Sequence, residues 1–220
     1  MWNLLAKTTR GTARALFALL SVAVAAYAFW YLYGGFRGGD PFAAQFAISG
    51  VDVPLHFFLA GLALLLGPIQ LSTALRRRWP VLHRLSGWLY AGSLLVASVS
   101  ALSLAQHAQG GLPSRAGFTV LALLWPCVTA IGIVHAIRGN FQAHRHWMCR
   151  SVALTFAAVT LRLMLGVGAG ALELPFMPVY VAASWLSWIL NLAACEALLR
   201  WPAIRTRLRR RGRFGVGASA

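Results

Sequence analysis

The stretch RGNFQAHRHWMCR, residues 138–150, is a basic segment with two histidines between two long apolar runs. An earlier stretch, RRRWPVLHRLSGW at residues 76–88, has the same character and also lies between apolar runs. In each stretch a His-Arg pair is followed within a few residues by Trp. We interpret both as basic turns that open a hydrophobic helix, and we expect any chemistry of this protein to lie there.

The composition is that of an integral membrane protein. Of the 220 residues, 59% are hydrophobic and 11% are charged, against about 25% charged in soluble domains, and the mean hydropathy is +0.68. Apolar runs of roughly 20 residues, enough to cross a hydrocarbon core of ~30 Å, occur six times. They cover residues 13–33, 53–75, 85–105, 117–137, 151–171 and 178–199.

These runs predict an all-α, polytopic membrane protein. Residues 1–200 are expected to form one six-helix domain with helices 2 to 5 as a core four-helix bundle, because the connections are too short for a second domain. Residues 201–220 are expected to be a basic, flexible cytoplasmic tail. His83-Arg84 aligns with His144-Arg145 at an offset of 61 residues. This offset suggests two parallel repeats, related by an axis along the membrane normal.

The positive charge indicates orientation rather than nucleic-acid binding. The formal net charge is +16, and nearly all of the 20 Lys and Arg residues lie in the N-terminal segment, in alternate connections and in the tail. Arg37 and Arg115 lie in the opposite connections, and Arg162 lies within a helix. By the positive-inside rule, both termini are cytoplasmic. The partners expected are therefore the bilayer and its anionic lipids at the cytoplasmic face, with no nucleic acid.

Six histidines are many for so apolar a chain. In the suggested repeat, His83 and His144 take equivalent places, so they would face each other and supply both axial ligands of a b-type haem. His135 competes as a ligand on the same side, and His56 with His107 offers a second, outer pair. The alternative interpretation is that these side chains bind lipid phosphates and helix ends. Zinc is not expected, since no Cys or carboxylate completes a tetrahedral set.

A second group of polar residues lies within the predicted helices. Arg162 is expected near mid-membrane, where its insertion costs ~2.5 to 3.5 kcal/mol, so it must face the bundle interior. Together with Asn191 and Glu196 it forms either a site for an anionic or quinone-like head group or a buried lock between helices 5 and 6. We favour the lock, because a carboxylate and a guanidinium satisfy each other without a ligand. Gln70, beyond a proline bend in helix 2, is expected to help satisfy a freed carbonyl.

Four short motifs carry a family resemblance. They are His56 with Gly67-Pro68, His83-Arg84 with Gly87 and Tyr90, His144-Arg145 with Trp147-Met148 and Arg150, and LTFAAVTLR at residues 154–162. With these motifs the chain, from about His56 to Glu196, resembles the bacterial membrane proteins of domain-of-unknown-function family 2306. The resemblance implies a multi-helix protein of a bacterial inner membrane, without an established activity or catalytic residues. The architecture alone also resembles six-helix electron carriers of the cytochrome b561 type, although that family places its histidines well inside four helices.

Three functions remain open for this sequence. They are a b-type haem electron carrier, a protein that binds or transports a small molecule or lipid, and a structural or assembly subunit of a membrane complex. Haem is the leading specific hypothesis, because the repeat brings two histidines to equivalent positions. No nucleotide-binding loop, nucleophile elbow or paired-carboxylate site is present, so no catalytic residue is assigned. Cys127, Cys149 and Cys195 are expected to be small packing residues.

Overall fold

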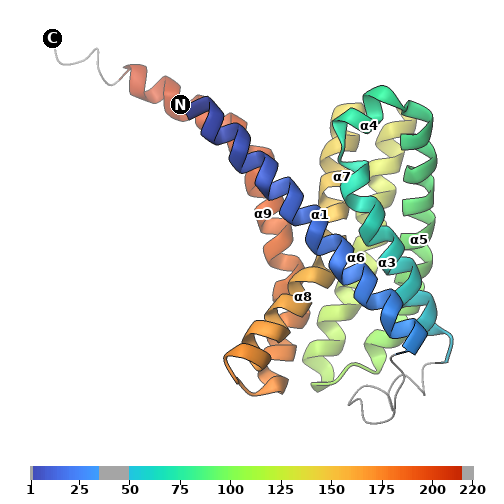
Figure 1. The fold of residues 1–220 in the computed structure, drawn as a ribbon. Helices are drawn as coiled ribbons and strands as arrows, with labels where there is room; N and C mark the ends of the chain where they lie inside the picture. Colours follow the sequence, from blue (N-terminus) through green and yellow to red (C-terminus); the bar gives the residue numbers. More distant parts are fainter. Residues whose placement is uncertain (1, 35–49, 215–220) are drawn as a thin grey trace.

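The computed structural model describes the backbone of residues 2–34 and 50–214 and the side chains of residues 11–33 and 50–201. Most of the predicted loop after the first helix, and residues 215–220, lie outside these ranges. The described chain is helical apart from short turns and contains no strand. Its elements are α1 (Trp2–Gly34), α3 (Asp52–Gln70), α4 (Thr73–Arg78), α5 (Pro80–Gln106), α6 (Gly111–Ile137), α7 (Phe141–Thr155), α8 (Ala157–Leu165), the π-helix η1 (Gly166–Ala171) and α9 (Phe176–Phe214) (Figure 1).

Six helical segments of the described chain are long and apolar enough to cross a membrane. They are Gly11–Tyr33 of α1, then α3, α5, α6, the stretch Phe141–Ala171 that joins α7, α8 and η1, and Phe176–Trp201 of α9. The prediction of an all-α protein with six membrane-spanning helices is therefore confirmed. α9 continues to Phe214, so the backbone of the predicted tail is helical up to that residue.

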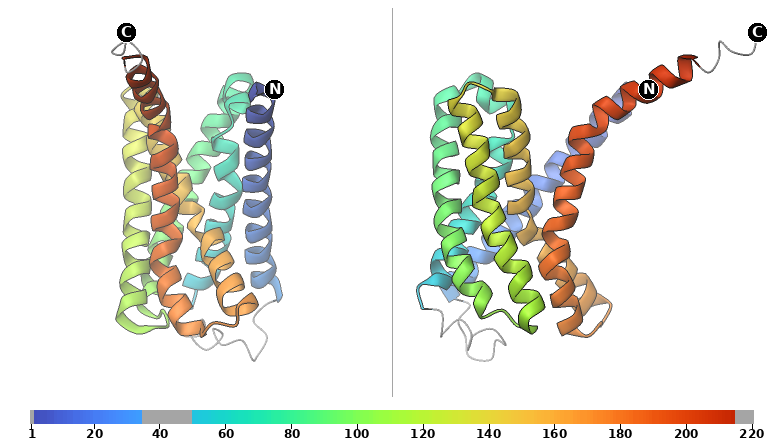
Figure 2. Two further views of the ribbon diagram at one scale, coloured as in Figure 1. Left: turned by 90° about the vertical axis from the view of Figure 1, so that its left-hand side faces the viewer. Right: turned by 180° about the vertical axis from the view of Figure 1, so that it is seen from behind.

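The core bundle consists of α3, α5, α6 and α7, the second to fifth spanning helices, as the sequence predicts. α3 packs against α5 and α7, and α6 packs against the same two helices. Buried Tyr90 and Leu94 of α5 belong to one apolar cluster with Val152 and Leu154 of α7. Gly67 lets α3 approach α7, since a Cβ at this position would lie 3.3 Å from Val152. α1 packs along α3, and α9 stands beside α7 and α8 (Figure 2).

The fifth membrane-spanning stretch, expected as one helix, is broken near its middle. α7 ends at Thr155, and α8 resumes after Phe156. The Thr155 hydroxyl donates to the Ser151 carbonyl at 3.0 Å, and the Val159 N–H bonds the Phe156 carbonyl only three residues back. Phe17 of α1 stacks on Phe156 at the break, with ring centroids 4.6 Å apart. Beyond it, α8 leaves the bundle and packs between α1 and α9 (Figure 1).

The basic stretches at residues 76–88 and 138–150 are mostly helical, which corrects their interpretation as turns. α5 already begins at Pro80, a position where the missing N–H of proline costs no hydrogen bond. α7 begins at Phe141, because the Asn140 side chain accepts a backbone N–H at 3.1 Å and caps the helix. His83 and His144 therefore lie in the first turns of two membrane-spanning helices.

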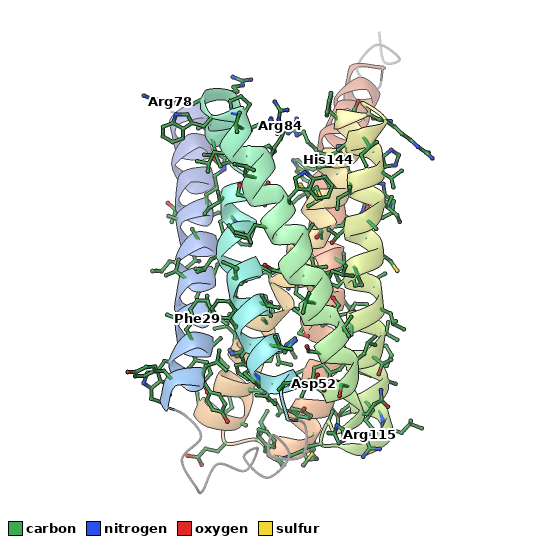
Figure 3. All side chains as sticks on the ribbon, turned by 90° about the vertical axis from the view of Figure 1, so that its right-hand side faces the viewer. Phe29, Asp52, Arg78, Arg84, Arg115 and His144 are labelled. Carbon is green, nitrogen blue, oxygen red and sulfur yellow. The ribbon has the colours of Figure 1, made fainter. Side chains whose placement is uncertain are left out.

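The two ends of the bundle differ in charge. α1 begins and α9 ends on the side where α4 carries three consecutive arginines at 76–78, and we call this side the arginine-rich end. Figure 3 shows Arg84 and His144 toward this end, and Asp52 and Arg115 at the opposite end, which we call the far end. The break at Phe156 thus divides an arginine-rich half, which holds the compact bundle, from a far half, where α8 has moved away.

Candidate functional site

A cavity of about 790 Å³ lies in the far half, between α1, α3, α5, α6, α8 and α9, with the end of α7 as part of its lining. Most of the side chains that line it are apolar, among them Leu64, Ala105 and Leu161. The space exists because α8 turns away from the bundle after Phe156, and α1 and α9 do not fill the gap that it leaves. Ligand pockets typically enclose about 300–1,000 Å³ and combine an apolar lining with a few polar groups. This cavity has the size and the lining of such a pocket.

Arg162 of α8 brings a positive charge to the cavity lining. Its Nη1 donates to the Ala158 carbonyl one turn earlier at 2.9 Å, and its guanidinium carbon lies 5.5 Å from the centre of the Tyr27 ring. In the described part of the chain it forms no ion pair, since the ion pairs found there join other residues. A guanidinium has five N–H donors, so a single carbonyl satisfies only a small part of it.

His56 of α3 lines the same cavity in a fixed orientation. Its Nδ1 lies 2.9 Å from the carbonyl oxygen of Ala97 on α5. Because a carbonyl only accepts hydrogen bonds, Nδ1 carries the proton, and Nε2 of the neutral ring keeps its lone pair. His107 also lines the cavity, with its Nδ1 3.1 Å from the Ser103 carbonyl oxygen. The two histidines expected as an outer pair therefore lie around one cavity.

The predicted lock of Arg162, Asn191 and Glu196 does not form. Glu196 of α9 pairs with Arg150 of α7 and, at 3.3 Å, with Arg200 one turn further along α9. The prediction was wrong because the break at Phe156 carries Arg162 away from the part of α9 that holds Glu196. Arg150, which precedes the break, is the residue of the fifth stretch that reaches this carboxylate.

Asn191 and Gln70, the two amides expected at a buried polar site, each join helices away from the cavity. Asn191 of α9 accepts from the Thr160 hydroxyl of α8 at 2.9 Å and donates to the Ala153 carbonyl of α7 at 3.2 Å. Gln70 at the end of α3 donates to the Ser86 hydroxyl of α5 at 2.7 Å. Neither amide is among the residues that line the cavity. Both hold helices together, and interhelical hydrogen bonds of this kind are usual in membrane proteins.

The two histidines proposed as haem ligands lie toward the arginine-rich end. The His144 Nδ1 lies 2.8 Å from the Gly132 carbonyl oxygen, so its Nε2 keeps a lone pair when the ring is neutral. The His83 Nδ1 is buried and has no hydrogen-bond partner among the described residues. His83 lies within electrostatic range of both His144 and Arg76. His135, the competing ligand, is half-buried in the last turn of α6.

A network of hydroxyl groups, which sequence reasoning missed, crosses the centre of the bundle. The Tyr90 hydroxyl lies 2.8 Å from the Ser151 Oγ and 2.7 Å from the Thr155 Oγ1. Trp125 donates to Thr155 at 3.0 Å, and the Thr129 Oγ1 lies 2.6 Å from the Ser151 Oγ. Trp125 and Thr155 also line the cavity, so the network forms part of its wall.

Sequence patterns gave no sign of this network, because isolated hydroxyls in an apolar run have no characteristic spacing. Tyr90 and Thr155 each fell within a family motif, but neither was assigned a hydrogen-bonding role. Tyr90 and Ser151 are nevertheless 61 residues apart, the same offset as the two His-Arg pairs. Contact between equivalent positions is what two parallel repeats predict for residues close to their common axis.

The site lies within a recognised family region. The family described as "Predicted membrane protein (DUF2306)" matches residues 53–199, about two thirds of the chain. The chain belongs to this family. Its resemblance to the family, inferred from the four motifs, is thereby confirmed. Neither the curated proteins nor the solved structures contain a match to the chain.

The DUF2306 region begins at Val53 and ends at Leu199, so it runs from α3 to the membrane-spanning part of α9. It includes His56 and Arg162, two of the polar residues that line the cavity. Tyr27, whose ring lies beside Arg162, belongs to α1 and falls outside the region. The cavity is therefore built mainly from DUF2306 helices, with α1 as an additional wall.

Proposed function

We propose that this DUF2306 protein binds a membrane-soluble small molecule or lipid, with the apolar body of the ligand in the cavity and its polar head group at Arg162. The observation that carries the proposal is the environment of Arg162. Its guanidinium lies within a membrane-spanning stretch, and its described partners are one backbone carbonyl and one aromatic ring. Ionisable residues inside membrane segments characteristically mark binding sites and transport pathways.

The free energy of burying this arginine supports the proposal. Inserting arginine near mid-membrane costs ~2.5 to 3.5 kcal/mol, and a carboxylate partner is the usual way to offset such a cost. The described carboxylate of α9, Glu196, pairs with Arg150 and Arg200 instead. For Arg162, a polar head group from a ligand would complete the coordination, and burial of the ligand's apolar part against the lining would be favourable.

We further propose that the arginine-rich end faces the cytoplasm of a bacterium, so that the cavity lies in the outer half of the inner membrane. The short helix α4 suits a bilayer surface. Arg78 lies 5.5 Å from the centre of the Trp79 ring, and this Trp side chain is 54% exposed. Tryptophan beside arginine is typical of the membrane interface, and arginines at this position attract anionic lipid.

Identification of co-purified ligands tests the proposed function. The protein is purified in a mild detergent, and its apolar contents are extracted and identified by mass spectrometry. Ala101→Phe places a ring in the cavity, whereas Ala26→Phe places the same ring on an exposed position of α1 that does not line the cavity. We expect the wild type and the Ala26 variant to retain a ligand and the folded Ala101 variant to lose it.

Retention of the same ligand by both folded variants would contradict the proposal, as would a wild-type protein that carries no apolar ligand and binds none added back. Co-purification of a protein partner in place of a ligand would favour the role of a subunit or assembly factor of a membrane complex.

A b-type haem between His83 and His144 is the second candidate function. It is favoured by the unused nitrogen atoms of these two rings, the Nε2 of His144 and the buried Nδ1 of His83. Histidines that bind a metal commonly donate their other ring N–H to a backbone carbonyl, as His144 does to Gly132. His144, oriented in this way, and His83 would supply the two axial ligands, and the haem would give the protein an electron-transfer role.

An absorption spectrum after haem-replete expression tests this candidate. We expect a Soret band that sharpens on reduction, disappears in the His83→Ala/His144→Ala double variant and remains in His146→Ala. A colourless wild-type protein would exclude haem at this pair.

A further inference from the structure

Two groups with opposite hydrogen-bonding needs line the cavity. Arg162 offers N–H donors and a full positive charge, whereas the Nε2 of His56 is an acceptor because its Nδ1–H is bound to the Ala97 carbonyl. The two side chains come from different helices, α3 and α8, and line the same cavity. No aspartate or glutamate is among the described residues that line the cavity. A ligand that satisfies both groups carries a negative charge for Arg162 and supplies a proton to the Nε2 of His56.

We propose that the ligand is a long-chain carboxylic acid, which binds with its carboxylate on Arg162 and its proton on His56. This inference rests on the function proposed above and names the class of its ligand. A neutral alcohol or quinone would leave the guanidinium charge without a counter-charge. A carboxylate supplies that charge, and its two oxygens match the fork of guanidinium N–H groups.

The proton explains how an acid reaches a site surrounded by apolar side chains. A carboxylate is costly to move through hydrocarbon, so the ligand enters as the neutral acid. At the site its O–H bond breaks, the electron pair stays on the carboxylate, and the proton forms an N–H bond at the Nε2 of His56. No further reactant is needed, and the net charge of protein and ligand together does not change. His56 then acts as a second cation facing the carboxylate.

A set of probes with the same sixteen-carbon chain tests the head group. They are hexadecanoic acid, its methyl ester, hexadecanol and hexadecane sulfonate, each titrated calorimetrically into the full-length wild-type protein in detergent. We expect the acid to bind about tenfold or more tightly than the alcohol and the ester, because only the acid supplies a charge for Arg162. The sulfonate carries the charge but no proton, so we expect it to bind more weakly than the acid.

Two variants assign the preference to a residue. Arg162→Gln is expected to reduce the affinity for the acid to that for the alcohol, while the affinity for the alcohol stays the same. Arg115→Gln, an identical change at an exposed arginine of the far end outside the cavity lining, is expected to leave the preference for the acid unchanged. The probe comparison uses the wild-type protein, so it stands even if a variant fails to fold.

The possible outcomes separate this inference from the proposed function. Equal affinities for the acid, the alcohol and the ester would overturn the carboxylic acid but leave the binding function intact. Absence of binding by all the probes would overturn the carboxylic acid, and the identification of co-purified ligands would then decide the binding function. Equal affinities for the sulfonate and the acid would overturn proton transfer to His56. A phosphatidic acid with sixteen-carbon chains is titrated alongside the four probes, and its tighter binding would assign Arg162 to a lipid phosphate and overturn the carboxylic acid.

Discussion

The two halves of the molecule treat buried polar groups in opposite ways. In the arginine-rich half, Glu196 pairs with Arg150 and Arg200, and the Tyr90 hydroxyl bonds two further hydroxyls. In the far half, Arg162 has a backbone carbonyl and an aromatic ring as described partners. Lipid provides no hydrogen bonds, so polar groups within a membrane need partners in the protein or in a ligand. The ion pairs of Glu196 and the Tyr90 hydroxyl network need no further partner, whereas Arg162 lacks a counter-charge among the described residues.

A single helix break therefore separates the structural region from the proposed binding region. Before the break at Phe156, α7 belongs to the packed bundle, where Glu196 and the Tyr90 hydroxyl have partners and the buried His83 Nδ1 has none among the described residues. After it, α8 lies between α1 and α9, and a cavity opens on the side that it has left.

Cysteine labelling assigns the two halves to the two sides of the membrane, with an all-or-none result. The native cysteines are first replaced by alanine. A cysteine at Leu112 of the far end should react with an impermeant maleimide added to intact cells, whereas one at Arg138 of the arginine-rich end should react only after permeabilisation, because arginine-rich connections stay inside. Both positions are exposed. Labelling of the Arg138 position in intact cells would reverse the assignment.

Removal of the shared carboxylate should cause the largest loss of stability. Glu196→Gln leaves Arg150 and Arg200 without their counter-charge. We expect the free energy of unfolding to fall by about 2 kcal/mol, below the ~3 to 5 kcal/mol of a fully buried pair, because both side chains of the main pair remain partly exposed. Denaturation in a detergent series measures it, and Glu173→Gln at an exposed far-end position serves as the control. An unchanged free energy would mean that this ion pair is not what holds α7 to α9.

Removal of one hydroxyl from the central network should have a moderate effect. Tyr90→Phe keeps the ring but leaves Ser151 and Thr155 each with one hydrogen bond fewer. We expect a loss of about 1 kcal/mol in the free energy of unfolding, in line with interhelical hydrogen bonds in membranes. Tyr33→Phe, at a side chain that is 96% exposed, should show no change. If the two variants behave alike, the network contributes nothing to the bundle.

Substitution of the cavity arginine should have the smallest effect on stability. Arg162→Leu removes a charge that has no described carboxylate partner, so the free energy of unfolding should stay the same or rise slightly. The same variant should lose the co-purified ligand, as measured by extraction and mass spectrometry. A fall in stability as large as that of Glu196→Gln would show that Arg162 has a structural partner after all, and would remove the contrast between the two halves.

Much of the fold was predictable, because it depends on the pattern of apolar runs and connections along the sequence. The lengths of the apolar runs identify the six spans, and the packing of the second to fifth runs follows from their short connections. For the candidate site, the sequence singled out Arg162 and His56, since charged and titratable groups are rare in apolar segments. It paired Arg162 with Glu196, whereas in the structure this carboxylate pairs with Arg150. It assigned no role to Tyr27, Trp125 or Thr155, whose residue types are common in membrane helices.

The sequence by itself determined the number of spanning helices, the alternation of basic and neutral connections, and the presence of an arginine that must face the protein interior. These properties depend on how apolar each segment is, and each segment carries that information alone. The contacts between polar side chains, in contrast, are visible only in the tertiary structure. The meeting of side chains depends on the direction of each helix, and the break at Phe156 redirects α8 without any change in hydropathy. That redirection separates Arg162 from Glu196 and opens the cavity beside it.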